Sequence, residues 1–234
     1  MNKKNQKRLL KDVLEIIKNP LDKDGIFYKH NENNMLQGYA MIIGPDDTIY
    51  RHGFYFFKFH YPKDYPFSPP KVTFQTNNNN VRFHPNLYRS GKVCLSLLNT
   101  WRGEQWTSCQ TIKTILLTLI TLLHNKPLLN EPGIKETYKY FNVYNKIIQW
   151  ANIKIAIYDI LNKSICKDYI KIFENDITEV LKKNKNKIEE YLIIMNASND
   201  GKDEDINFRI PLYSMDVNIN YKKLCDLLIP LIKC

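Results

Sequence analysis

The hydrophobic residues near the N-terminus recur with the period of a helix. Leu9, Val13 and Ile16 fall on one helical face, which predicts a helix over about residues 5–18. Pro20 ends this helix, because proline lacks the backbone N–H that a continuing helix needs. Basic residues lie between the apolar positions, so the opposite face is expected to be exposed to solvent.

The pattern then changes to short apolar and aromatic runs, which are typical of strands. Three runs cover residues 25–30, 36–43 and 53–60, and residues 71–75 are a candidate for a fourth strand. Asparagine, aspartate, glycine and proline separate the first three runs and favour short turns. Short turns join antiparallel neighbours, so the pattern predicts a four-stranded antiparallel meander.

The rest of the chain is mostly helical after a long stretch without a clear period. Residues 81–109 are irregular, and long irregular segments inside compact domains are usually functional. Helical patterns return at residues 112–123, at 138–161 with a possible break near Phe141, at 169–191 and at 221–232, while residues 196–205 are loop-like. The sequence therefore predicts an α/β fold with a meander sheet backed by helices.

Composition and charge narrow the class of protein without naming an activity. The 234 residues are 44% hydrophobic and 25% charged, as in ordinary globular proteins, and the net charge of +10 favours acidic partners. The five cysteines form no C-x-x-C pair, so we expect neither a zinc site nor a disulfide framework. The N-terminus has no signal-peptide pattern, and the apolar run at 115–123 is too short to span a bilayer. We therefore expect a cytoplasmic or nuclear protein that does not engage a membrane.

One segment carries chemistry-bearing residues at a distinctive spacing. It starts with His84-Pro85-Asn86 and ends with Val93-Cys94, so Asn86 lies eight positions before the cysteine. This order resembles the active-site signature of ubiquitin-conjugating enzymes, in which the cysteine accepts ubiquitin. The resemblance implies a ubiquitin-conjugating (UBC) fold and an acyltransferase activity.

Other landmarks agree with this resemblance. The proline-rich segment 65–72 is similar to the one after the family's third strand, and Trp106 is similar to the tryptophan that follows the active site. Asn145 follows a tyrosine, as in a late helix of the family. Together these landmarks imply a UBC core domain over residues 1–162.

Two finer features are similar to the large Z-type ubiquitin-conjugating enzymes. Segment 101–106 has an additional tryptophan and a glycine, and segment 130–133 replaces an acidic stretch of the family. Z-type enzymes carry a helical C-terminal extension. The resemblance therefore implies that residues 163–234 form such an extension, packed on or beside the core.

The chemistry of ubiquitin transfer explains the residue types of the motif. Thiolate is a good nucleophile and a good leaving group, so the resemblance implies that Cys94 holds the modifier as a thioester. Asn86 offers an N–H donor for the oxyanion that forms when an amine attacks. Alternatively, Asn86 holds the active-site loop by bonding to backbone. His84 and Pro85 are expected to shape the turn that places Asn86.

Three further residues are expected near the cysteine. Trp106 is expected to line the active-site groove as a packing residue. Asn130 stands where the family has an acidic or polar residue that lowers the pKa of the attacking lysine. Cys109 is expected to be packed inside at the start of the next helix, and not to act as a second acceptor.

The resemblance also implies protein partners, but no metal and no organic cofactor, because the activating enzyme is the one that uses ATP. The partners are ubiquitin or a ubiquitin-like modifier, the activating enzyme, a ubiquitin ligase and a protein substrate. The expected contacts are Lys7, Arg8 and Lys11 with the activating enzyme, and Phe67, Thr107 and Ser108 with a ligase. The basic run at 182–187 is interpreted as a solvated surface, so we expect no nucleic-acid partner.

Two alternatives from other classes remain open on the sequence. One is a non-catalytic scaffold of the same fold that binds ubiquitin or a ligase, although Cys94 argues against it. The other is a cysteine hydrolase that pairs Cys94 with His84 or His124, which would need a histidine oriented by a third group.

Overall fold

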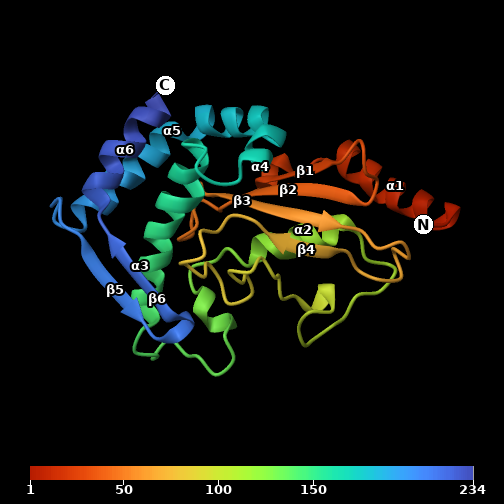
Figure 1. Ribbon diagram of the computed structural model, residues 1–234, viewed down its shortest axis with the longest axis horizontal. Coiled ribbons are helices and arrows are strands. Elements are labelled where there is room, and N and C mark those ends of the chain that lie inside the picture. The colour runs from red at the N-terminus through yellow and green to blue at the C-terminus, as the bar shows by residue number, and fades with distance from the viewer. Residues whose placement is uncertain (234) are drawn as a thin grey trace.

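The computed structural model describes residues 1–233, and Cys234 lies outside the described residues (Figure 1). At its centre is an antiparallel sheet in which strands that follow each other in sequence are also neighbours in space. The strands are β1 (Ile26–His30), β2 (Gln37–Ile43), β3 (Phe54–His60) and β4 (Lys71–Phe74). The expected four-stranded meander is therefore confirmed.

Alternate residues of each strand face opposite sides of the sheet, as the two-residue period of a strand requires. On one side Ala40, Ile42, Tyr55 and Phe57 belong to the main hydrophobic core. From the first 151 residues, the helices that contribute to this core are α1 (Lys3–Lys18), α2 (Ile112–Thr121) and α3 (Phe141–Ala151). The expected first and second helices are confirmed, and α3 begins at the residue where a break was expected.

The other side of the sheet is covered by the C-terminal extension. Its helices here are α4 (Lys167–Ile172) and α5 (Glu174–Ala197). The shared hydrophobic cluster consists of Met41, Ile43, Phe54, Phe56, Ile160, Ile170, Phe173 and Ile177. Because the extension buries apolar side chains of β2 and β3, it packs directly on the core sheet.

Short helical segments lie between these elements. They are η1 (Asp22–Asp24), η2 (Ser96–Leu98), η3 (Pro127–Asn130), the π-helical η4 (Asn152–Asp159) that continues α3, and η5 (Leu212–Ser214). The buried Asn152 ties η4 to the sheet. Its amide Nδ2 donates to the Arg51 carbonyl at 2.9 Å, and its Oδ1 accepts from the Tyr55 hydroxyl at 2.6 Å.

The extension also contains a hairpin that the sequence reading missed. Strands β5 (Ile206–Ile210) and β6 (Met215–Ile219) pair antiparallel, and α6 (Tyr221–Lys233) follows them. The hairpin lies beside α3 in Figure 1, at the end of the molecule opposite α1. Both strands alternate apolar and polar residues, so the two-residue period was present in the sequence. The extension is therefore helical with an inserted hairpin.

Candidate functional site

Backbone hydrogen bonds bring the two ends of the motif together. The N–H of Cys94 donates to the Asn86 carbonyl at 2.9 Å, and the Asn86 amide Nδ2 donates to the Cys94 carbonyl at 2.6 Å. Both side chains are inside the protein, with Asn86 at 7% and Cys94 at 1% relative exposure. Cys94 is thus covered by the surrounding protein.

The Asn86 side chain holds the active-site loop through a hydrogen bond to backbone. Its bond to the Cys94 carbonyl is the backbone contact expected of a loop-holding asparagine. A side-chain amide has two N–H donors, so one bond to the loop leaves a second donor for another acceptor. The geometry is therefore compatible with both roles considered for Asn86.

His84 is a neutral, structural histidine in this arrangement. Its Nδ1 accepts the backbone N–H of Asn86 at 2.9 Å, which shapes the turn through Pro85. Burial lowers the pKa of His84 to about 3, and the charges of His124 and Arg82 act in the same direction. The ring is therefore unprotonated at neutral pH.

This pKa shift predicts a stability change with pH. The unfolded chain binds a proton at His84 below about pH 6.5, while the folded chain resists protonation to about pH 3, so stability falls as pH falls through this window. The contribution of this one group is about 2 kcal/mol between pH 7.5 and pH 5. In His84→Asn the side-chain oxygen can still accept the Asn86 N–H. The free energy of unfolding, measured with urea, should therefore change about 2 kcal/mol less between pH 7.5 and pH 5 than in the wild type. Equal pH dependence of the two proteins would contradict the assignment.

Asn130 reaches the same region from η3. Its Oδ1 lies 3.0 Å from Nε2 of His124, and the His124 and His84 rings are 5.9 Å apart between centroids. Asn130 itself is exposed. The structure therefore brings His84, His124 and Asn130 together, although they are up to 46 positions apart in the sequence.

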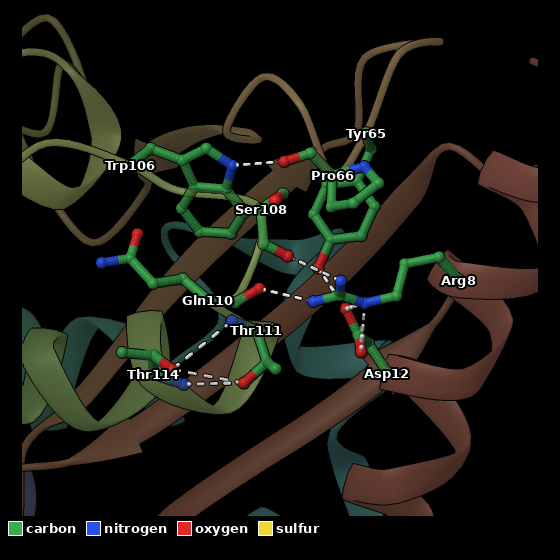
Figure 2. A network of polar contacts seen from close by, with 9 residues as sticks. All are labelled: Arg8, Asp12, Tyr65, Pro66, Trp106, Ser108, Gln110, Thr111 and Thr114. Atoms are coloured by element: carbon green, nitrogen blue, oxygen red, sulfur yellow. Dashed lines mark hydrogen bonds and ion pairs between the residues drawn. The ribbon is translucent and has the colours of Figure 1, made fainter.

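Trp106 joins two loops beside the site. Its indole Nε1 donates to the Pro66 carbonyl at 2.7 Å, and its ring packs against Tyr65 (Figure 2). The expectation of a packing residue agrees with its 7% relative exposure. The expected ligase contacts on the same two loops, Phe67, Thr107 and Ser108, are all exposed. Cys109 is exposed as well, so the expectation that it packs inside was wrong.

Arg8 does not point freely outward as the sequence reading expected. Its Nε lies 3.0 Å from both carboxylate oxygens of Asp12, its Nη1 donates to the Ser108 carbonyl at 2.6 Å, and its Nη2 donates to the Gln110 carbonyl at 2.8 Å (Figure 2). The buried Asp12 also accepts the Tyr65 hydroxyl at 2.5 Å. Arg8 therefore ties α1 to the segment before α2. A buried carboxylate on the helix face explains the difference, because it needs a paired cation.

The outer face of α1 keeps the other expected basic residues and adds an apolar stripe. Lys7 and Lys11 are exposed. Leu10, Leu14 and Ile17 are exposed too, at 49%, 43% and 60%. Their i, i+4, i+7 spacing was visible in the sequence, but it was not separated from the buried stripe of the same helix.

Two further features were sought among the described residues, a metal-binding group and a membrane-spanning helix. Within residues 1–233, no group of three or more His, Cys, Asp or Glu side chains is arranged to bind a metal ion. Across the same residues, no helix has the length and apolar character needed to cross a membrane.

Comparisons with known proteins agree with the motif and the fold. Residues 8–148 match the family described as ubiquitin-conjugating enzyme. The chain is 38% identical over 168 residues to ubiquitin-conjugating enzyme E2 Z of Xenopus tropicalis, a match that covers 70% of this chain and 53% of that protein. It is 40% identical over 157 residues to the E2 Z of Homo sapiens, covering 66% and 44%.

A further relative matches the extension as well. The probable ubiquitin-conjugating enzyme protein 17 of Caenorhabditis elegans is 33% identical over 228 residues, which cover 92% of this chain and 31% of that protein. The chain spans about half the length, or less, of the curated relatives that it matches. The family match covers more than half of the chain, so this protein belongs to the ubiquitin-conjugating enzyme family, with a UBC core similar to that of the Z-type members.

Proposed function

We propose that this protein accepts ubiquitin or a ubiquitin-like modifier on Cys94 as a thioester and passes it to an amine or to a ligase. The observation that carries this proposal is the pairing of Asn86 with Cys94 through two hydrogen bonds, in a chain of this family. No metal or organic cofactor takes part, and ATP is used by the activating enzyme.

The proposed reaction has two acyl transfers. The Cys94 thiolate attacks the thioester on the activating enzyme, a new thioester forms, and the activating enzyme's thiol leaves. A substrate lysine amine then attacks the Cys94 thioester, loses a proton, and expels the Cys94 thiolate as the isopeptide forms. A donor beside the cysteine stabilises the oxyanion of the second step, and Asn86 is the candidate.

The hydrolase alternative finds less support at this site. His84 is neutral, and its Nδ1 accepts the Asn86 N–H. His124 interacts with Asn130 and with the Lys126 backbone N–H. Among the residues that the structure describes, neither histidine has a hydrogen bond to Cys94. A hydrolase would also release the modifier, whereas a conjugating enzyme holds it.

A charging experiment tests the proposal. The protein is mixed with ATP and ubiquitin or a ubiquitin-like modifier, each with its activating enzyme. We expect one such combination to yield an adduct that reductant cleaves, and later transfer of the modifier to added lysine. Free modifier accumulating without any adduct would favour the hydrolase, and binding without an adduct would favour the scaffold.

The outer face of α1 is the proposed contact for the activating enzyme. Lys7 and Lys11 are exposed there, whereas Arg8 is engaged in hydrogen bonds within the protein. Exposed charges mainly accelerate encounter, and salt screens them beyond about 8 Å at physiological ionic strength. Reversal of both lysines should therefore slow charging and leave the later discharge to lysine unchanged.

The test compares Lys7→Glu/Lys11→Glu with Lys182→Glu/Lys185→Glu. The second pair changes the net charge equally, but on exposed positions of α5. At low salt the α1 variant should charge about tenfold more slowly than wild type, and the difference should shrink as salt is added. If both variants slow charging equally, overall charge and not the α1 surface is responsible.

The ligase contacts are proposed from the family resemblance. The exposed Phe67, Thr107 and Ser108 are the proposed ligase contacts. A cytoplasmic or nuclear location is proposed from the absence of a disulfide framework in the sequence.

A further inference from the structure

The turn of the β5–β6 hairpin reaches the active-site loop. This turn contains Tyr213 and Ser214, both at positive φ (61° and 47°) although neither is glycine. Left-handed backbone is costly for such residues and persists only where the surroundings hold it, often at functional positions. The contacts of Tyr213 show what holds it here.

Besides an edge contact between its ring and that of Tyr144, Tyr213 makes three contacts with the core domain. Its ring stacks on the Arg82 guanidinium, with 4.2 Å between the Arg82 carbon Cζ and the ring centroid. Its carbonyl accepts from Nη2 of Arg89 at 2.6 Å, and its hydroxyl donates to the Glu131 carboxylate. Arg82 and Arg89 lie close to or within the motif segment, and Glu131 directly follows Asn130.

Arg82 links Tyr213 to the turn at His84-Pro85-Asn86. Its guanidinium contacts the Tyr213 ring and also the Tyr88 ring, whose centroid lies 3.7 Å from Cζ, and it donates to the Pro85 carbonyl. Pro85 is followed directly by Asn86, whose side chain bonds to the Cys94 carbonyl. A continuous set of contacts therefore runs from the extension to the proposed acceptor.

The backbone of Arg82 is also held by hydrogen bonds, one of them from the hairpin. Its N–H donates to the Met215 sulfur at 3.3 Å, and its carbonyl accepts the Tyr144 hydroxyl at 2.8 Å. Met215 is the first residue of β6, so two residues of the hairpin, Tyr213 and Met215, contact Arg82. Among the described residues, Arg82 has no carboxylate partner, and the aromatic rings take the place of one.

We propose that Tyr213 is a positioning residue for the transfer step, acting through Arg82 on the turn that places Asn86. This inference rests on the proposed function. Small displacements of an oriented catalytic group cost a large factor in rate, because the donor no longer meets the developing charge. The extension thereby forms part of the active-site support and does more than cover the sheet.

The test measures single-turnover discharge of the pre-charged protein to saturating lysine, alongside its charging rate and its melting temperature. Tyr213→Ala and Tyr213→Leu remove the ring from Arg82, and Leu retains apolar bulk if Ala does not fold. Both should slow discharge about 10- to 100-fold. Tyr213→Phe keeps the ring and the backbone carbonyl, and should restore most of the rate.

Phe208→Ala is the matched control. Phe208 is an aromatic residue of the same hairpin and packs on the main core near Lys146 of α3, away from Arg82. We expect this variant to lower the melting temperature but to discharge at nearly the wild-type rate. If Phe208→Ala slows discharge as much as Tyr213→Ala, the effect is general loosening and the positioning role is wrong.

A double-mutant cycle identifies the route. If Tyr213 acts through Asn86, Tyr213→Leu should slow discharge much less in an Asn86→Ala background than in the wild type. Full additivity would contradict the route, and a Tyr213→Phe protein as slow as Tyr213→Leu would contradict the role of the ring. Failure of the wild type to form any adduct would instead overturn the proposed function, so the two failures are distinguishable.

Discussion

The protein with Cys94 replaced by alanine is expected to form no covalent adduct with the modifier, even with excess activating enzyme and ATP. The loss should be complete, because the thiol itself supplies the bond that holds the acyl group. Cys94→Ser should instead form an adduct that survives reductant, since an oxygen ester replaces the thioester. Gels run with and without reductant distinguish these outcomes.

Cys109 provides the control for this experiment. It is exposed, whereas Cys94 is only 1% exposed, so accessibility alone would favour Cys109 as the acceptor. Cys109→Ala should nevertheless charge at the wild-type rate. An adduct that persists in Cys94→Ala and disappears in Cys109→Ala would show that Cys109 is the acceptor. Because Cys94 is 1% exposed, we expect charging to need a local opening of its loop.

Asn86→Ala is expected to slow discharge to lysine by roughly 100- to 1000-fold while charging stays nearly normal, which is the typical cost of losing one oxyanion donor. The same change removes the bond to the Cys94 carbonyl and should reduce the free energy of unfolding by about 1–3 kcal/mol. Single-turnover discharge and urea unfolding measure the two effects separately.

Thr100→Val separates loop-holding from oxyanion stabilisation. The Thr100 hydroxyl donates to the carbonyl of Val93, next to Cys94, so its removal loosens the same loop and leaves Asn86 in place. This variant should lose stability with little change in discharge. Equal discharge by wild type and Asn86→Ala, together with a loss of stability, would leave Asn86 with the loop-holding role alone.

The sequence was informative wherever a local pattern sufficed. The strands followed from runs of apolar and aromatic residues, and each expected end lies within one residue of the structure. The motif from His84 to Cys94 predicted that Asn86 lies near the cysteine, and two hydrogen bonds join them. The hairpin in the extension was missed although its alternation was readable, because its two short strands lie between two longer helical patterns.

Other features needed contacts between distant parts of the chain. Arg8 looked like a free surface charge, yet it bonds carbonyls of Ser108 and Gln110, about a hundred positions away. Cys109 looked like a helix-start residue packed inside, and it is exposed. The exposure of a residue depends on which neighbours the fold brings to it, and a one-dimensional period does not contain that information.

The sequence by itself therefore determined the family, the meander and the residues of the motif, because spacing along the chain encodes them. Only the tertiary structure decided that Cys94 is covered, that α5 packs on the second face of the sheet, and that the Tyr213 ring contacts Arg82. The last two features depend on side chains more than a hundred positions apart that meet only in the folded protein. Packing of that kind is set by the complete core and not by any local segment.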